Sequence, residues 1–252
     1  MRPIRSAAML MLSALAVAAL VAGPQAAHAQ ELPSAKSLMD KHDAAIGGRA
    51  ALDKHTSLHQ AGSLSLQGME ATIDIYRAKP SLFVQKLVLG GMGEVLQGYD
   101  GKTAWVMQGG QPLVLDSAQT QQFKYNSDFF GNFHDMARYK SAETVELTDF
   151  DGRKCYKVKL VRVTGGEGFE FFDATTGLGA GIIATVDGPM GKVEQTTMFG
   201  EYKEYGGMRF PTRIVQKGAM GEVTISIKTS EFDGVDPVTF ALPDAVKALV
   251  KP

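Results

Sequence analysis

The sequence predicts a mainly β protein with a few helices, built on one strongly curled antiparallel sheet. Apolar and polar residues alternate along most of the chain after residue 56, which is the period of a half-buried strand. Short turns rich in Gly, Asp and Pro separate these segments, and strands joined by tight turns are antiparallel because parallel pairs need long crossovers. About eleven such strands are more than a flat open sheet usually carries, so the sheet must curl.

The N-terminus has the three parts of a cleavable secretory signal. Two arginines lie near its start, an almost unbroken apolar run spans 7–22, and Ala27-His28-Ala29 supplies the small residues of a cleavage site. A retained membrane anchor is the alternative, but the run is shorter than the roughly 20 residues that a spanning helix needs. We therefore expect residues 1–29 to be a signal peptide and residues 30–252 to form a single domain, exported to the periplasm without a transmembrane anchor.

Composition narrows the range of partners. The 252 residues include 26 basic and 27 acidic side chains, and no basic patch stands out, so nucleic acid is not expected to bind. The only cysteine, Cys155, cannot form an internal disulfide and lies too far along the chain to be lipidated at the cleavage point. Its strand-like surroundings predict a small core residue. We expect a monomer.

The elements follow in order. Ser34 is a candidate N-cap for a helix that Gly47-Gly48 ends, and a shorter helical turn follows over 49–54. The predicted strands are 57–67, 69–78, 82–89, 94–99, 103–108, 143–149, 154–163, 168–173, 178–187, 191–203, 208–217 and 221–232.

Two segments do not follow the alternation. Residues 116–139 are polar and then aromatic, which predicts a helix followed by an irregular segment. Pro243 to Val250 predicts a short closing helix. The first helix and residues 116–139 are the candidates to fill the concave face of the curled sheet, an arrangement that creates a cavity.

Apolar residues at alternating strand positions are the candidates to line that cavity. The alternative is that they form ordinary core, and about half should face the cavity because side chains alternate between the two faces. The candidates are Ile73, Ile75, Phe83, Leu87, Trp105, Val158, Phe169, Phe171, Ile225 and Ile227. The strand pattern leaves the direction of Trp105 open. We expect it to point inward, where a large aromatic side chain buries most area.

Four methionines at glycine-containing turns are candidates for a flexible fringe at the cavity mouth: Met69, Met92, Met190 and Met220. Unbranched thioether side chains adapt to irregular apolar ligands. In an up-and-down sheet alternate turns fall on the same rim, which groups these tips in pairs within each half of the chain. The alternative is that the glycines serve the turns and the methionines pack on neighbours.

Residue patterns for catalysis or metal binding are weak. His55 and His59 have a helical metal-binding spacing, but the Glu of an H-E-x-x-H motif is missing and the segment between them looks like a passage into a strand. His42 lies on the apolar face of the first helix and is expected to be a core or boundary residue. We find no G-x-S-x-G elbow and no paired carboxylates, so we expect no catalytic residue, no metal site, no cofactor and no enzymatic activity.

Five segments in order resemble a known family: Ile46–Leu52, Gly98–Trp105, Phe172–Leu178, Tyr202–Ile214 and Val238–Pro243. The second has the form G-x-D-G-x-x-x-W, and the fourth reads Y-K-E-Y-G-G-M-R-F-P-T-R-I. Together they resemble the outer-membrane lipoprotein-sorting (LolA-like) superfamily, in particular its poorly characterised exported members. The resemblance covers nearly the whole exported chain. It implies a strongly curved antiparallel half-barrel whose open side is covered by helices, with an apolar cavity for acyl chains and no catalytic residue.

The resemblance implies a function of the same kind. We expect a periplasmic, non-enzymatic binder, carrier or chaperone of lipids or lipoprotein acyl chains in the cell envelope. The alternative is an interaction or sensor module that docks on an envelope peptidase or assembly factor, because some similar proteins occur beside or fused to peptidase-like proteins.

Overall fold

The computed structural model describes residues 31–91, 93–188, 191–219 and 221–250 of the chain. Within these ranges thirteen strands are present: β1 (Ser57–Leu66), β2 (Met69–Ala78), β3 (Leu82–Leu89), β4 (Gly93–Tyr99), β5 (Ala104–Gln108), β6 (Gln111–Val114), β7 (Tyr139–Phe150), β8 (Arg153–Arg162), β9 (Glu167–Asp173), β10 (Gly179–Gly188), β11 (Gly191–Tyr205), β12 (Met208–Gly218) and β13 (Gly221–Phe232).

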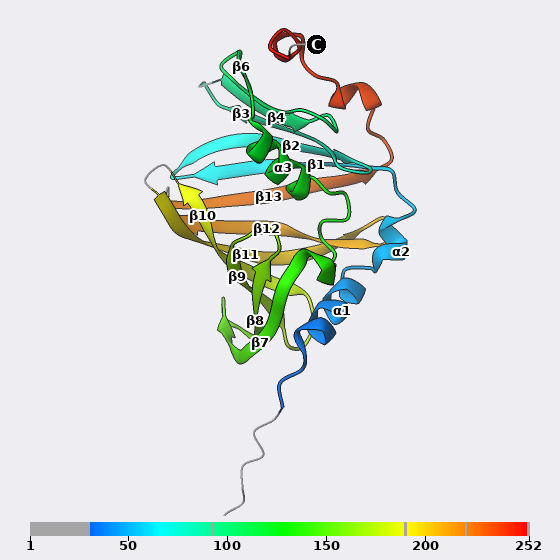
Figure 1. Ribbon diagram of the computed structural model, residues 1–252, viewed down its shortest axis with the longest axis vertical. Coiled ribbons are helices and arrows are strands. Elements are labelled where there is room, and N and C mark those ends of the chain that lie inside the picture. The colour runs from blue at the N-terminus through cyan, green and yellow to red at the C-terminus, as the bar shows by residue number, and fades with distance from the viewer. Residues whose placement is uncertain (1–30, 92, 189–190, 220, 251–252) are drawn as a thin grey trace, which may run out of the picture. The chain divides into compact units, whose positions relative to one another are not determined.

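All thirteen strands belong to one antiparallel sheet, in the order β6-β5-β4-β3-β2-β1-β13-β12-β11-β10-β9-β8-β7. The chain thus makes two meanders, β1–β6 and β7–β13, and the pairing of β1 with β13 joins them in the middle of the sheet (Figure 1). The outermost strands β6 and β7 do not pair with each other. The sheet is therefore an open, curved half-barrel, which confirms the predicted fold class.

The predicted strands agree with the observed ones to within a few residues at each end. The clearest miss is β6, which no prediction contained. It has only four residues and includes Pro112, which cannot donate a ladder hydrogen bond. It is tolerated there because β6 is an edge strand with a single neighbour, β5.

The helices are short: α1 (Ala35–Ala45), α2 (Arg49–Leu52), α3 (Ser117–Asn126), the 3₁₀ turns η1 (Met136–Arg138) and η2 (Pro237–Phe240), and α4 (Asp244–Lys247). The predicted cap of α1 is confirmed, since the side chain of Ser34 accepts a hydrogen bond from the N–H of Ser37 at 3.2 Å. Helix α3 starts with a capping box formed by Asp116 and Gln119. No helix in the described ranges is long and apolar enough to cross a bilayer.

Helix α1 ends against the turn between β11 and β12. Gly47 has a φ of +117°, and a Cβ at this position would lie 2.3 Å from the carbonyl oxygen of Gly207. The N–H of Arg209 donates to the carbonyl of Ile46 at 2.9 Å. Only glycine fits a left-handed backbone in such close contact, so Gly47 both ends the helix and seats it on the sheet.

Helices and turns cover both faces of the sheet. Phe83 and Val84 are neighbours in β3 and therefore point to opposite faces. Phe83 contacts Phe123 of α3, whereas Val84 packs with Phe240 of η2 and Val246 of α4. Helix α3 thus lies on the concave face together with α1 and α2, and the C-terminal turns cover the opposite face of the first meander.

Candidate functional site

A cavity of about 320 Å³ lies on the concave face. Its floor is formed by strands from both meanders, and its cover is formed by α1, α2 and residues 127–135, which we call the capping segment. Most of the lining is apolar and includes Ile46, Leu58 and Phe210. Its volume falls near the lower end of the roughly 300–1,000 Å³ typical of small-molecule sites.

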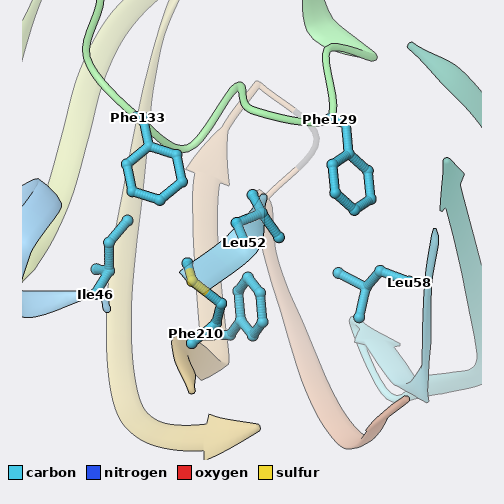
Figure 2. Packing of buried hydrophobic residues seen from close by; sticks show 7 residues of the cluster. Ile46, Leu52, Leu58, Phe129, Phe133 and Phe210 are labelled. Atoms are coloured by element: carbon cyan, nitrogen blue, oxygen red, sulfur yellow. The ribbon is translucent and has the colours of Figure 1, made fainter. Parts of the chain in front are cut away.

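The capping segment contributes aromatic rings to the cavity wall. Figure 2 shows Phe129 and Phe133 pointing from this segment toward Leu52 and Phe210. Both rings are only 5% exposed. The N–H of Phe129 donates to the carbonyl of Pro80 at 3.0 Å, which ties the segment to the turn between β2 and β3. The capping segment is therefore held in place by two buried aromatic rings and by a backbone hydrogen bond.

Of the ten predicted lining residues, four border the cavity: Ile75, Phe171, Ile225 and Ile227. The ring of Phe171 also stacks on Phe150, with 4.0 Å between centroids. Ile225 lies directly across from Ile214 of β12, another lining residue. These positions lie on β2, β9, β12 and β13, so both meanders contribute to one cavity, and their contact with a ligand stays a prediction.

The other candidates are packed elsewhere. Ile73 and Leu87 are cross-strand partners on the same face as Ile75, but they do not border the cavity. Phe83 lies under α3, and Val158 lies under α1. Phe169 packs with Phe171 and Cys155 in a separate cluster. Cys155 is fully buried, as expected for a small core residue.

Trp105 does not point into the cavity. It is 2% exposed and packs with Val84, Phe240 and Val246, on the face covered by the C-terminal turns. The expected inward orientation is corrected for a physical reason. We expected the ring to bury most of its area on the concave side. Instead, η2 and α4 cover the opposite face and bury the ring there.

The predicted methionine fringe is only partly described. Leu66 pairs with Val223, so the turn between β12 and β13 lies beside the turn between β1 and β2. The end of β1 and the start of β13 therefore lie at the same rim of the sheet. Met69 is 43% exposed there. Met92, Met190 and Met220 lie outside the described residues, so the fringe stays a prediction.

A polar cluster that the sequence did not predict lies in the cavity wall. Nδ1 of His134 is 2.8 Å from Oδ1 of Asp43, and its Nε2 is 2.9 Å from Oε2 of Glu170. The backbone N–H of His134 also donates to Asp43 at 3.1 Å. The cluster joins α1, the capping segment and β9. No spacing motif could have revealed it, because residues 43, 134 and 170 are far apart in sequence.

The cluster holds one charged and one neutral imidazole. Burial alone would lower the pKa of His134, but its hydrogen bonds to Asp43 and Glu170 outweigh burial and raise the pKa to about 9. Burial alone would likewise raise the pKa of Glu170, and the contact with His134 holds it below its usual value. Burial and the neighbouring charge of His134 lower the pKa of His42 to about 4. His42 is 9% exposed, as expected for a core histidine.

A second unpredicted polar group is the guanidinium of Arg77, which borders the cavity. Its pKa is lowered by burial, an effect that the charge of Asp128 opposes. The guanidinium lies 5.2 Å from the centre of the Phe83 ring. Among the described residues, the ion pair of Asp128 is with Arg138, at 3.6 Å, and not with Arg77. Arg77 therefore places a cationic side chain among the residues that line the cavity.

His55 and His59, which the sequence pattern brought together, have separate partners. Nδ1 of His55 is 2.7 Å from Asp233, and Nε2 of His59 is 2.8 Å from Asp74. The ring of His59 stacks on Tyr76. The two histidines belong to different hydrogen-bonded pairs rather than to one site.

The fold and the site define a class of protein: an antiparallel half-barrel with a covered apolar cavity on its concave face. No family model and no curated protein matches the sequence. A DUF1329 family protein from Desulfovibrio piger matches with a TM-score of 0.56 and 12% identity, over 82% of this chain and 97% of that chain. LolA superfamily protein NE2245 from Nitrosomonas europaea matches with a TM-score of 0.54 and 13% identity, over 84% and 99%.

A third solved structure gives the same result. A proposed outer membrane lipoprotein-sorting protein domain from Vibrio parahaemolyticus matches with a TM-score of 0.51 and 10% identity, over 81% of this chain and 94% of that one. At such low identities the matches establish the fold alone. The protein has a LolA-like fold, and this confirms at the level of structure the resemblance that its sequence motifs indicate.

Proposed function

We propose that the protein is a non-enzymatic carrier of acyl chains, from lipids or lipoproteins, in the periplasm. The observation that carries this proposal is the apolar cavity between the concave face of the sheet and the capping segment. Two proteins with the same fold, a LolA superfamily protein and a lipoprotein-sorting domain, support a client of this kind.

The free energy of burying an acyl chain, set against the cost of association, favours a ligand with one chain and a polar head. A chain of ~15 methylenes gains about 12 kcal/mol gross on burial, at ~0.8 kcal/mol each. Association costs roughly 4–15 kcal/mol, so apolar burial alone supports only weak to moderate binding. Arg77 supplies the missing attraction, because a guanidinium forms paired hydrogen bonds with a carboxylate or phosphate. The ligand class that fits best is an amphiphile with one acyl chain and an acidic head.

The proposal is tested by substitutions on the strands that form the floor of the cavity, which fill it with larger side chains. Ile214 and Ile225 are cross-strand neighbours that both border the cavity, so changing both to Trp should occupy the space that a chain would use. Ile183→Trp is the matched control, because Ile183 does not border the cavity and points to the face opposite that of its cavity-lining neighbour Ile182. We expect purified protein to contain lipid by native mass spectrometry and to bind a fluorescent fatty acid. The double variant should lose at least about tenfold in affinity and the control should not.

Two results would overturn the proposal. One is wild-type protein that carries no lipid and does not bind the fatty acid. The other is a folded double variant with unchanged affinity. A stable protein partner recovered by cross-linking in the periplasm, together with the first result, would favour the docking module instead.

A further inference from the structure

His42, Asp43 and His134 bring two imidazoles and a carboxylate together in the cavity wall. One ligand atom from each lies within 4.8 Å of the other two. His42 and Asp43 are consecutive residues of α1, and His134 comes from the capping segment, which contacts α1 at Asp43. We propose that these three residues bind one divalent transition-metal ion of the Zn²⁺ class.

The donor set suits such an ion. Imidazole nitrogen and carboxylate oxygen are typical ligands of zinc and its first-row neighbours, whereas magnesium and calcium prefer oxygen alone. Ligand atoms around a tetrahedral zinc lie about 3.3 Å apart. The pair formed by His134 Nδ1 and Asp43 Oδ1, at 2.8 Å, is already close to that spacing. The widest pair, within 4.8 Å, must close by up to about 1.5 Å, which side-chain rotation would supply.

In each histidine the ring nitrogen that would not bind the metal has the kind of partner that metal-ligating histidines usually have. A ligating histidine usually donates its second ring N–H to a carboxylate or a backbone carbonyl, which fixes the tautomer and the ring. Nε2 of His134 contacts Glu170 at 2.9 Å, so Nδ1 is the nitrogen for the metal. His42 has a hydrogen bond with the backbone of Gly177, and its Nδ1 has no partner in the described residues. The free nitrogen of His42 is therefore Nδ1.

The unpartnered Nδ1 of His42 is the observation that points to a ligand. Buried polar atoms in native proteins almost always have a partner, and each exception needs an explanation. The nitrogen is fully buried, and the His42 ring meets the His134 ring edge-on with 5.3 Å between centroids. A metal ion bound to Nδ1 supplies the missing partner. It also takes the place of the Nδ1 proton of His134, which passes to solvent.

The competing interpretation is an ion network without a metal. His134, charged and placed between Asp43 and Glu170, is a satisfied arrangement by itself. That network does not use His42, whereas a metal site does. His42 is therefore the residue whose substitution separates the two interpretations.

The experiment is a Co²⁺ titration of the protein expressed from its full chain with a histidine-free tag and stripped with a chelator. We expect one Co²⁺ per chain, with visible absorption bands that Zn²⁺ abolishes by displacement. His42→Phe keeps an aromatic ring in the same space and should weaken binding at least 100-fold, or about 2.7 kcal/mol. Glu170→Gln should weaken it about 10–100-fold, the usual effect of an outer partner. His59→Phe is the control, because His59 pairs with Asp74 elsewhere, and should leave binding unchanged.

The proposal is overturned if wild-type protein shows no such bands, whatever the variants do. It is also overturned if folded His42→Phe binds Co²⁺ as tightly as wild type, because the ions would then bind elsewhere. His42→Gln serves as a second substitution if circular dichroism shows that His42→Phe is unfolded.

Discussion

Trp105 lies directly across from Gly98 on the neighbouring strand, and its indole ring covers the glycine. A Cβ built on Gly98 would lie 2.6 Å from Cζ2 of the ring and 3.0 Å from the carbonyl oxygen of Phe83. The first and last residues of the motif G-x-D-G-x-x-x-W therefore form one packing unit. Gly98 is required by the ring above it rather than by a turn.

Gly98→Ala should destabilise the protein. The added methyl group must displace either the buried indole or the backbone of β3, and such overpacking costs typically about 1–3 kcal/mol. Urea unfolding measures the loss. Gly90→Ala is the matched control, since the nearest atom to its Cβ is 4.0 Å away, and it should change stability by less than about 0.5 kcal/mol. Equal effects for the two variants would contradict the packing role.

Trp105 should report on the C-terminal turns and not on a ligand. Adding fatty acid to the protein should leave its emission spectrum unchanged, because the ring is buried on the face opposite the cavity. Phe240→Ala should shift the emission to the red and cost about 3–5 kcal/mol, since it opens a cavity beside the ring. Phe123→Ala, on the concave face, should leave the emission maximum in place. A ligand-induced shift in wild type would show that Trp105 senses the cavity.

The pair formed by His55 and Asp233 should make stability depend on pH. The hydrogen bond from His55, with others from Thr56, lowers the pKa of Asp233 from 3.8 to about 2. This stabilisation is present above pH 3.8 and is lost as the pH falls toward 2. The hydrogen bond to Asp233 raises the pKa of His55 above 6.5, so its contribution is complete below pH 6.5 and is lost above it.

The advantage of wild type over Asp233→Asn should therefore be largest between pH 3.8 and 6.5 and shrink on both sides. Because the Asp233 side chain is 45% exposed, screening limits the effect to about 1 kcal/mol or less. Unfolding free energies at several pH values measure it. Asp149→Asn removes one partner of an exposed pair with Lys154 and serves as the control, with little change expected. An advantage that is constant with pH would exclude the ion pair as its cause.

Removing the imidazole of His134 should lower the stability of the protein, because its two acidic partners would lose their cation. In chelator-treated protein, His134→Phe leaves Asp43 and Glu170 without their cation, although their side chains are only 23% and 14% exposed. Breaking such a pair costs about 3–5 kcal/mol. Adding Asp43→Asn and Glu170→Gln should recover part of the loss by removing the buried charges. A triple variant no more stable than His134→Phe would mean that packing, not charge, causes the loss.

The sequence alone predicted the local structure well, and the reasons are local. The cap at Ser34 and the break at Gly47 act within one helical turn, and the strands follow from alternation and turn chemistry. The short strand β6 was missed because its four residues with Pro112 carry little alternation. Four of ten lining candidates border the cavity, because alternation assigns residues to a face but does not say which part of that face a helix will cover.

What the sequence by itself determined is the fold class: period-2 alternation and tight turns dictate an antiparallel sheet, and its strand number requires curvature. Only the tertiary structure decided the pairing of β1 with β13, the burial of Trp105 under the C-terminal turns, and the meeting of His42, Asp43, His134 and Glu170. These relationships join residues that are distant along the chain. They depend on how covering segments pack on each face, and packing between remote segments leaves no periodic signal in the sequence.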